Sequence, residues 1–148
     1  MADAQEVKKL REQTGAGVMD AKKALQEAEG DFDKAAEIIK EKGLAKADSK
    51  SDREIKAGIV TSYVHNDRIG AVLRLGCETD FVAKSEPFTQ LADNLIKQVV
   101  AMGPQDIDEL MAQPFFKDEK TTIEELIKST IAQTGENIRV DEFYRIEL

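Results

Sequence analysis

The sequence predicts an α+β protein, in which a small helical domain precedes a core built on an antiparallel sheet. Apolar residues recur at helical spacing over residues 1–43, whereas apolar and polar residues alternate over residues 59–77 and 138–148. The first pattern is typical of amphipathic helices, and the second is typical of strands with one solvated face. Helical patterns separate the alternating segments, so we expect a three-stranded antiparallel sheet with helices on one face.

Residues 1–43 carry the signals of three short helices. Asp3 can cap the first helix, and the glycines of the segment TGAG end it, because glycine tolerates backbone angles that other residues avoid. The second helix is expected from Val18 to Ala28, and the third from a cap at Asp31 to Gly43. Three short helices with alanine-rich inner faces bury little apolar surface, so this bundle would be marginal as an isolated unit.

The polar segment at residues 44–54 is predicted to link this domain to a core at residues 55–148. The core begins with a hairpin that turns at the segment HNDR, which starts at His65. It ends with a strand over the segment NIRVDEFYRIEL, the last twelve residues, where alternation is expected to continue to the end of the sequence. One face of that strand is expected to hold Ile138, Val140, Tyr144, Ile146 and Leu148.

Helices are expected between these strands. A long helix pattern begins near Ser85 and stops at Gly103, where a glycine and a proline follow each other. A short helix over the segment DIDELMAQ and a loop over PFFKDEK come next. Thr122 then forms a capping box with Glu125, and this helix is expected to end at Gly135.

Composition excludes several classes of function. The chain has a net charge of −8, one histidine and one cysteine. So acidic a chain repels phosphate backbones, and we expect no direct contact with nucleic acid. The histidine, His65, falls in the predicted turn, and neither zinc-ligand spacing nor a phosphate-binding glycine motif is found, so we expect no catalytic residue, metal or cofactor. With no apolar run of about 20 residues and no secretory leader, we expect a cytoplasmic protein that does not bind membranes.

Two apolar side chains do not fit the predicted helix faces. In the second helix the inner stripe is Val18, Ala21, Leu25 and Ala28, which leaves Met19 on the outer face near Lys23. Phe81 lies in a polar connector between a strand and a long helix that already have complete apolar faces. Either residue can serve this chain's own packing, Met19 by covering the glycine turn and Phe81 by filling the core. Either can instead contact a partner, but the pattern alone favours packing within this chain for both residues.

Three colinear segments resemble the elongation factor Ts family. They are LREQTGAGVMDAKKAL from Leu10, CETDFVAK from Cys77, and the C-terminal stretch from PFFKDEKTTIEELI to TGENIRVDEFYRIEL. The resemblance implies a ubiquitin-associated-like (UBA-like) three-helix domain joined to an α+β core. It also implies a guanine-nucleotide exchange factor for elongation factor Tu, the GTPase that carries aminoacyl-tRNA to the ribosome.

The same resemblance implies two groups of partner-binding residues. An N-terminal anchor would dock on the G domain of the GTPase through Lys9, Val18, Met19 and Lys23. A wedge that reaches the magnesium and phosphate site would consist of Thr79, Asp80, Phe81 and Val82. Exchange of this kind requires no covalent chemistry, so the chain is not expected to be an enzyme.

The sequence also departs from the family pattern. Only about a dozen residues separate Met102 from Pro114, where longer members carry a helical insertion, so the chain resembles the short single-core form. Such members can pair through their sheets, and we expect a homodimer that uses the strand ending at Leu148. Tyr144 occupies a position where some members have cysteine, so no disulfide between subunits is expected. The usual pair of methionines reads Val18-Met19 here, which keeps the apolar character of the anchor.

Two other functions compete with this interpretation. A UBA-like adaptor could bind a protein or peptide partner through Met19 and the glycine loop without any exchange activity. A hydrolase could use Glu78 and Asp80 as an acid/base pair, but a carboxylate pair alone provides no substrate-positioning motif.

Overall fold

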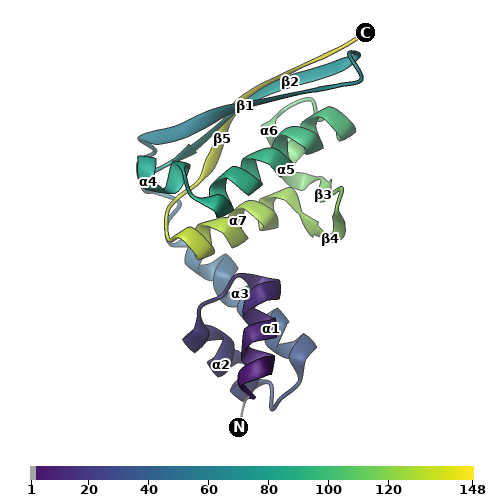
Figure 1. Cartoon of the computed structure of the whole chain (residues 1–148). Coiled ribbons are helices and arrows are strands. Elements are labelled where there is room, and N and C mark those ends of the chain that lie inside the picture. Colours follow the sequence, from purple (N-terminus) through teal and green to yellow (C-terminus); the bar gives the residue numbers. More distant parts are fainter. Residues whose placement is uncertain (1–2) are drawn as a thin grey trace.

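The structure, a computed structural model, describes residues 3–148, so the first two residues of the predicted N-terminal domain lie outside the described residues. Three helices at the N-terminal end pack beside a larger α+β unit (Figure 1). They are α1 (Ala4–Thr14), α2 (Val18–Glu27) and α3 (Phe32–Asp48). Their shared core is as small and alanine-rich as the sequence predicts: Leu10, Ala21, Ala24, Leu25, Ala28 and Ala35.

The ends of these helices follow the local signals in the sequence. The Asp3 carboxylate accepts a hydrogen bond from the backbone N–H of Gln5 at 3.1 Å, which caps α1. Gly15 ends this helix with a φ of 74°, in the left-handed region that glycine adopts at little cost. Asp31 caps α3 in the same way as Asp3 caps α1, by accepting from the N–H of Lys34.

Helix α3 is longer than predicted. It passes through Gly43, where the sequence suggested its end, and continues to Asp48 through part of the predicted linker. Gly43 faces α7 (Ile123–Thr134), and a Cβ built on it would lie 3.4 Å from the Cβ of Ala132. This glycine therefore allows two helices to approach closely instead of ending one of them.

The predicted three-stranded antiparallel sheet with helices on one face is confirmed. Strands β1 (Ala57–His65), β2 (Ile69–Cys77) and β5 (Arg139–Glu147) pair in the order β1-β2-β5. Figure 1 shows α5 (Glu86–Met102) and α7 on the same side of this sheet. The largest fully buried side chains of this unit are contributed by the strands and helices that meet there: Leu73, Leu75, Phe88, Leu95, Ile96, Leu110 and Ile123.

Strand β5 does not keep one apolar face, so that prediction was wrong. Val140 pairs with Leu75 and Glu142 with Arg74, which leaves Asp141 as an extra residue in a β-bulge. Side chains alternate with a period of two, so one extra residue moves every later side chain to the other face. Val140 is buried, but Tyr144, Ile146 and Leu148 are exposed on the side of the sheet away from α5.

Three small elements complete the core: α4 (Asp80–Ala83), α6 (Ile107–Ala112) and a hairpin of β3 (Pro114–Phe115) with β4 (Asp118–Thr122). The sequence suggested a loop where this hairpin lies. The buried side chain of Gln98 fixes its start, because the amide accepts from the N–H of Phe116 at 2.9 Å and donates to the carbonyl of Pro114 at 3.0 Å. Within residues 3–148, every helix is too short or too polar to cross a bilayer.

Candidate functional site

The first candidate site is the Phe81 turn, by which we mean residues 79–83. Thr79 caps α4 by accepting a hydrogen bond from the N–H of Val82 at 3.3 Å. Successive residues of a helix point about 100° apart, so neighbouring side chains on one turn have different surroundings. Val82 is buried against the sheet, whereas Phe81 is 85% exposed and Asp80 is exposed beside it. Of the four predicted wedge residues, Thr79, Asp80 and Phe81 thus face solvent and Val82 holds the turn to the core.

The Phe81 turn is held from outside by the segment that joins α7 to β5. The Glu136 carboxylate accepts hydrogen bonds from the N–H of Glu78 at 3.1 Å and from the N–H and hydroxyl of Thr79 at 3.0 and 2.7 Å. Sequence reasoning missed Glu136, because its Thr79 partner lies 57 positions away and is engaged partly through its backbone. No local pattern could indicate such a contact.

The turn also constrains the single cysteine. Cys77 is fully buried, and its thiol donates to the carbonyl of Thr79 at 3.2 Å. Burial raises the pKa of the Cys77 thiol above its ordinary value, and the nearby negative charge of Glu136 raises the pKa further. The thiol is therefore held protonated and buried, which is the state of an unreactive structural cysteine.

The second candidate site is the anchor surface, formed by Lys9, Val18, Met19 and Lys23 on α1 and α2. Met19 is 62% exposed, in agreement with its predicted outer position. Val18 is 50% exposed, so its predicted place in the inner stripe of α2 was wrong. It is the first residue of the helix and lies beyond the end of the small core. The ammonium group of Lys9 lies 5.0 Å from the centre of the Phe32 ring, a cation–π contact that fixes this lysine over α3.

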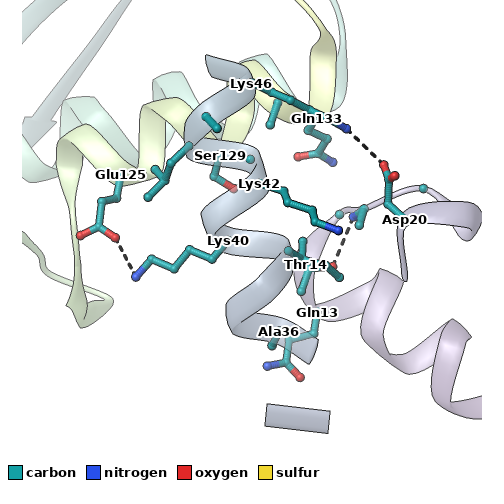
Figure 2. Close-up of a pocket in the computed structure, with 18 of the residues that line it drawn as sticks. Gln13, Thr14, Asp20, Ala36, Lys40, Lys42, Lys46, Glu125, Ser129 and Gln133 are labelled. Carbon is teal, nitrogen blue, oxygen red and sulfur yellow. Dashed lines mark hydrogen bonds and ion pairs between the residues drawn. The ribbon is translucent and has the colours of Figure 1, made fainter. Parts of the chain in front are cut away.

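A cleft of about 760 Å³ lies beside the anchor surface, between the α1–α2 loop, α3, α7 and β4. Figure 2 shows Lys40 and Lys46 of α3 extending to opposite sides of it. Lys40 Nζ lies 2.7 Å from Glu125 Oε2 on α7, and Lys46 Nζ lies 3.4 Å from Asp20 Oδ2 on α2. These ion pairs tie α3 both to the core and to the helix that carries Met19.

The two candidate sites lie on different parts of the molecule. The Phe81 turn follows β2 at one end of the sheet, and the anchor surface lies on α1 and α2, beyond α7 (Figure 1). Phe81 and Met19 are thus two exposed apolar side chains on separate surfaces, and neither is buried in this chain's own core.

Comparisons with known proteins agree with this picture. A family model described as elongation factor Ts matches residues 78–148. Proteins named elongation factor Ts from Thermodesulfovibrio yellowstonii and Thermotoga neapolitana are 40% and 41% identical to this chain, and each alignment covers at least 96% of this chain and 94% of the relative. A chloroplastic elongation factor Ts from Cyanidioschyzon merolae is 42% identical over 96% of this chain and 91% of that protein.

The alignments also show that this chain is shorter than its relatives. The alignment with the Thermodesulfovibrio protein spans 189 positions, whereas this chain has 148 residues, so at least 41 positions of that relative have no counterpart here. The alignment nevertheless covers 98% of this chain. This chain therefore belongs to the elongation factor Ts family.

Proposed function

We propose that this chain is a guanine-nucleotide exchange factor that binds elongation factor Tu in its GDP form and promotes release of GDP. Its family supports a role in translation elongation. The observation that carries the proposal is the exposure of Phe81 on a turn whose next residue is buried. Burying a phenylalanine is favourable by roughly 1.5–3 kcal/mol, so an exposed one on a fixed turn is available to a partner's pocket.

Exchange of this kind needs no covalent step. A GTPase holds GDP through backbone donors around the phosphates and through a bound Mg²⁺. A factor that binds the nucleotide-free or opened G domain more tightly than the GDP form shifts the population toward release. In this proposal Phe81 enters near the phosphate site, Asp80 disturbs the surroundings of the magnesium ion, and Thr79 and Val82 hold the turn.

The anchor surface supplies the binding free energy that one side chain cannot. A nanomolar Kd for a nucleotide corresponds to about 12 kcal/mol, several times the contribution of a single phenylalanine. We propose that the N-terminal helices form a UBA-like domain that docks on the G domain through Lys9, Val18, Met19 and Lys23. Met19 suits this role because a flexible thioether adapts to an irregular apolar surface.

We also propose that the chain forms a homodimer. The exposed face of the sheet carries an outer patch of apolar side chains, and an apolar patch of this kind is typical of a protein interface. The bulge in β5 places the side chains of Tyr144, Ile146 and Leu148 on this face, so the face itself, more than the strand edge, would pair with a second copy. The outer patch consists of Val60, Val64, Val72, Tyr144, Ile146 and Leu148.

The division into domains and the location of the protein also remain proposals. Residues 1–43 would form the anchor domain, residues 44–54 the linker and residues 55–148 the core, with α3 continuing across the first boundary. Ion pairs on both sides of α3 support a fixed linker more than a flexible one. A cytoplasmic location is the simplest expectation for a translation factor, although one relative is named as chloroplastic.

The direct test is stopped-flow release of a fluorescent GDP from elongation factor Tu. Phe81→Ala should slow release roughly tenfold to hundredfold, the equivalent of 1.5–3 kcal/mol. Met19→Ala should raise the concentration of factor needed for half-maximal release. Phe116→Ala and Met102→Ala are matched controls, because both side chains are exposed outside the two candidate sites. If Phe81→Ala promotes GDP release as fast as the unchanged chain, the assignment of Phe81 as the wedge is wrong. If the unchanged chain binds elongation factor Tu without accelerating GDP release, the chain is an adaptor.

A further inference from the structure

We propose that Glu136 is a positioning residue that orients the Phe81 turn for its partner. This inference rests on the proposed function, in which Phe81 is the wedge. Glu136 does not need to touch the partner: it acts through Thr79, the residue that caps α4.

The Phe81 turn needs support from outside, because it is too short to order itself. Helix α4 has four residues, and an isolated helix this short is unstable in water because its first turn fixes many dihedral angles for few hydrogen bonds. The side chain of Phe81 contributes little to the stability of the turn, since it is almost fully exposed. The orientation of its ring is thus set by the buried Val82 on one side and by the cap on the other.

Glu136 supplies the cap with a continuous chain of hydrogen bonds. The Thr79 hydroxyl donates to Glu136 Oε2 at 2.7 Å and accepts from the N–H of Val82 at 3.3 Å. A hydroxyl that donates to a carboxylate is polarised, which makes its oxygen a better acceptor for the helix N–H. The other carboxylate oxygen, Oε1, accepts from the backbone N–H groups of both Glu78 and Thr79.

The segment that carries Glu136 is itself held in place. Asn137 is buried, its backbone N–H donates to Glu78 Oε1 at 2.8 Å, and its side-chain amide donates to the carbonyls of Ser51 at 3.3 Å and Arg53 at 2.8 Å. The Arg53 guanidinium donates in turn to the carbonyl of Gly135 at 3.3 Å. The residues that follow α3, the α7–β5 segment and the start of the Phe81 turn therefore form one hydrogen-bonded unit.

A turn fixed in this way has a consequence for function. Ordering a mobile segment on binding makes the binding free energy less favourable, and a segment that is already ordered avoids this loss. Removing the Glu136 carboxylate does not alter the Phe81 side chain itself, but it should allow the ring to point in many directions. The factor would keep its anchor and lose much of its ability to release GDP.

The first arm of the test needs no partner. Amide hydrogen exchange in the isolated chain should be at least about tenfold faster in Glu136→Ala at Glu78, Thr79 and Val82, with amides outside residues 78–85 unchanged. Exchange at these amides in Glu136→Gln should be faster than in the unchanged chain and slower than in Glu136→Ala. The glutamine amide oxygen can still accept from the backbone, whereas its NH₂ group cannot accept from the Thr79 hydroxyl. Glu124→Ala is the matched control, an exposed glutamate at the other end of α7 that pairs with Lys128.

The second arm measures GDP release at saturating factor. Glu136→Ala should lower the maximal rate by about tenfold, equal to 1.4 kcal/mol, and should add no further loss when combined with Phe81→Ala. A role in general stability would not produce this dependence on Phe81.

Three results would overturn the proposal: exchange at the turn no faster than in Glu124→Ala, exchange raised equally throughout the chain, or a loss in release that adds fully to that of Phe81→Ala. If Phe81→Ala alone is fully active, the proposed wedge is wrong, and hydrogen exchange then decides by itself whether Glu136 orders the turn.

Discussion

Tyr144 pairs with Val72 on the exposed face of the sheet, and both side chains are open to solvent, 65% and 44% respectively. Cross-strand neighbours of this kind normally gain their stability by packing together against a further layer. Here the helical layer covers the opposite face, so the pair contributes to an apolar surface that remains to be covered. A second copy of the chain would cover it symmetrically, since the same patch would face itself.

The first prediction is that this surface holds two chains together. Light scattering should give a mass of about 33 kDa, twice the 16.4 kDa of one chain. Tyr144→Lys should reduce the measured mass to the mass of one chain, because the two added lysines would face each other across a desolvated interface. Met102→Lys introduces the same charge at an exposed apolar side chain on α5 and should leave the mass unchanged. A mass of 16.4 kDa for the unchanged chain at working concentration would contradict the homodimer.

The bulge that creates this surface could not be predicted from the alternating pattern. The sequence from Ile138 to Leu148 alternates except at Glu142 and Phe143, and this break shows that a regular strand does not fit without showing which residue is the extra one. Its pairing depends on β2, where Leu75 meets Val140 but Arg74 meets Glu142. Local features such as the caps at Asp3, Asp31 and Thr122 were predictable because their partners lie two or three residues away. A bulge depends on a second strand far along the sequence.

The second prediction concerns Arg145, which the bulge moves to the helical side of the sheet. Its guanidinium donates through Nε and Nη2 to the carbonyl of Val100, near the end of α5, at 3.3 and 3.0 Å. Hydrogen bonds to charged groups contribute roughly 1.5–3 kcal/mol, and cations are favourable at helix C-termini. Arg145→Ala should therefore lower the free energy of unfolding in urea by about 1–3 kcal/mol.

Arg139→Ala is the control for this substitution, because its side chain lies on the same strand but is mostly exposed and pairs with Asp141. An exposed ion pair contributes less than about 1 kcal/mol. Equal losses for the two variants would mean that Arg145 does not support α5.

The third prediction concerns the contact between Gly43 and Ala132. Gly43→Ala should be neutral or should raise the free energy of unfolding by up to about 1 kcal/mol, because alanine favours the helix and its Cβ would just fit. Gly43→Leu should lower it by about 1–3 kcal/mol, since the larger side chain would force α3 away from α7. Ala45→Leu places the same leucine side chain at an exposed position of α3 and should change little. If Gly43→Leu were as stable as Ala45→Leu, the close approach would not matter.

Gly43 also illustrates why the end of α3 was mispredicted. Glycine after a helical pattern commonly ends a helix, and Gly15 and Gly135 do so here with positive φ. The same residue type can instead permit two helices to pack closely, and nothing in the local sequence separates the two cases.

The candidate sites were predictable to a similar degree. Met19 and Phe81 stood out in the sequence because they did not fit an apolar face, and both are exposed in the structure. Periodicity alone favoured packing within the chain for both residues, because it records which face of an element is apolar and nothing about a partner. Glu136 and Asn137 were beyond reach for a different reason, because the contacts that define them join segments more than fifty residues apart.

The fourth prediction concerns Cys77 and alkaline pH. Burial, and after it the charge of Glu136, raises the pKa of this thiol above its ordinary value of 9.0, so the folded chain holds the proton more tightly than the unfolded chain. The contribution of the thiol to stability is then fully present below the unfolded pKa and is lost as the pH rises through the folded one. The difference in unfolding free energy between the unchanged chain and Cys77→Ala should be constant near neutral pH and should decline above about pH 9.

Using this difference removes the parallel effects of other groups, such as Tyr144 and Lys128, whose pKa values are also raised. Cys77→Ala also loses packing in the core, but that loss does not depend on pH. Alkylation provides an independent readout: the native chain should react with iodoacetamide only as fast as it opens, because the thiol is buried and protonated. A difference in stability that stays constant up to about pH 10, together with rapid alkylation of the native chain, would show that the thiol is accessible and that burial does not control its proton.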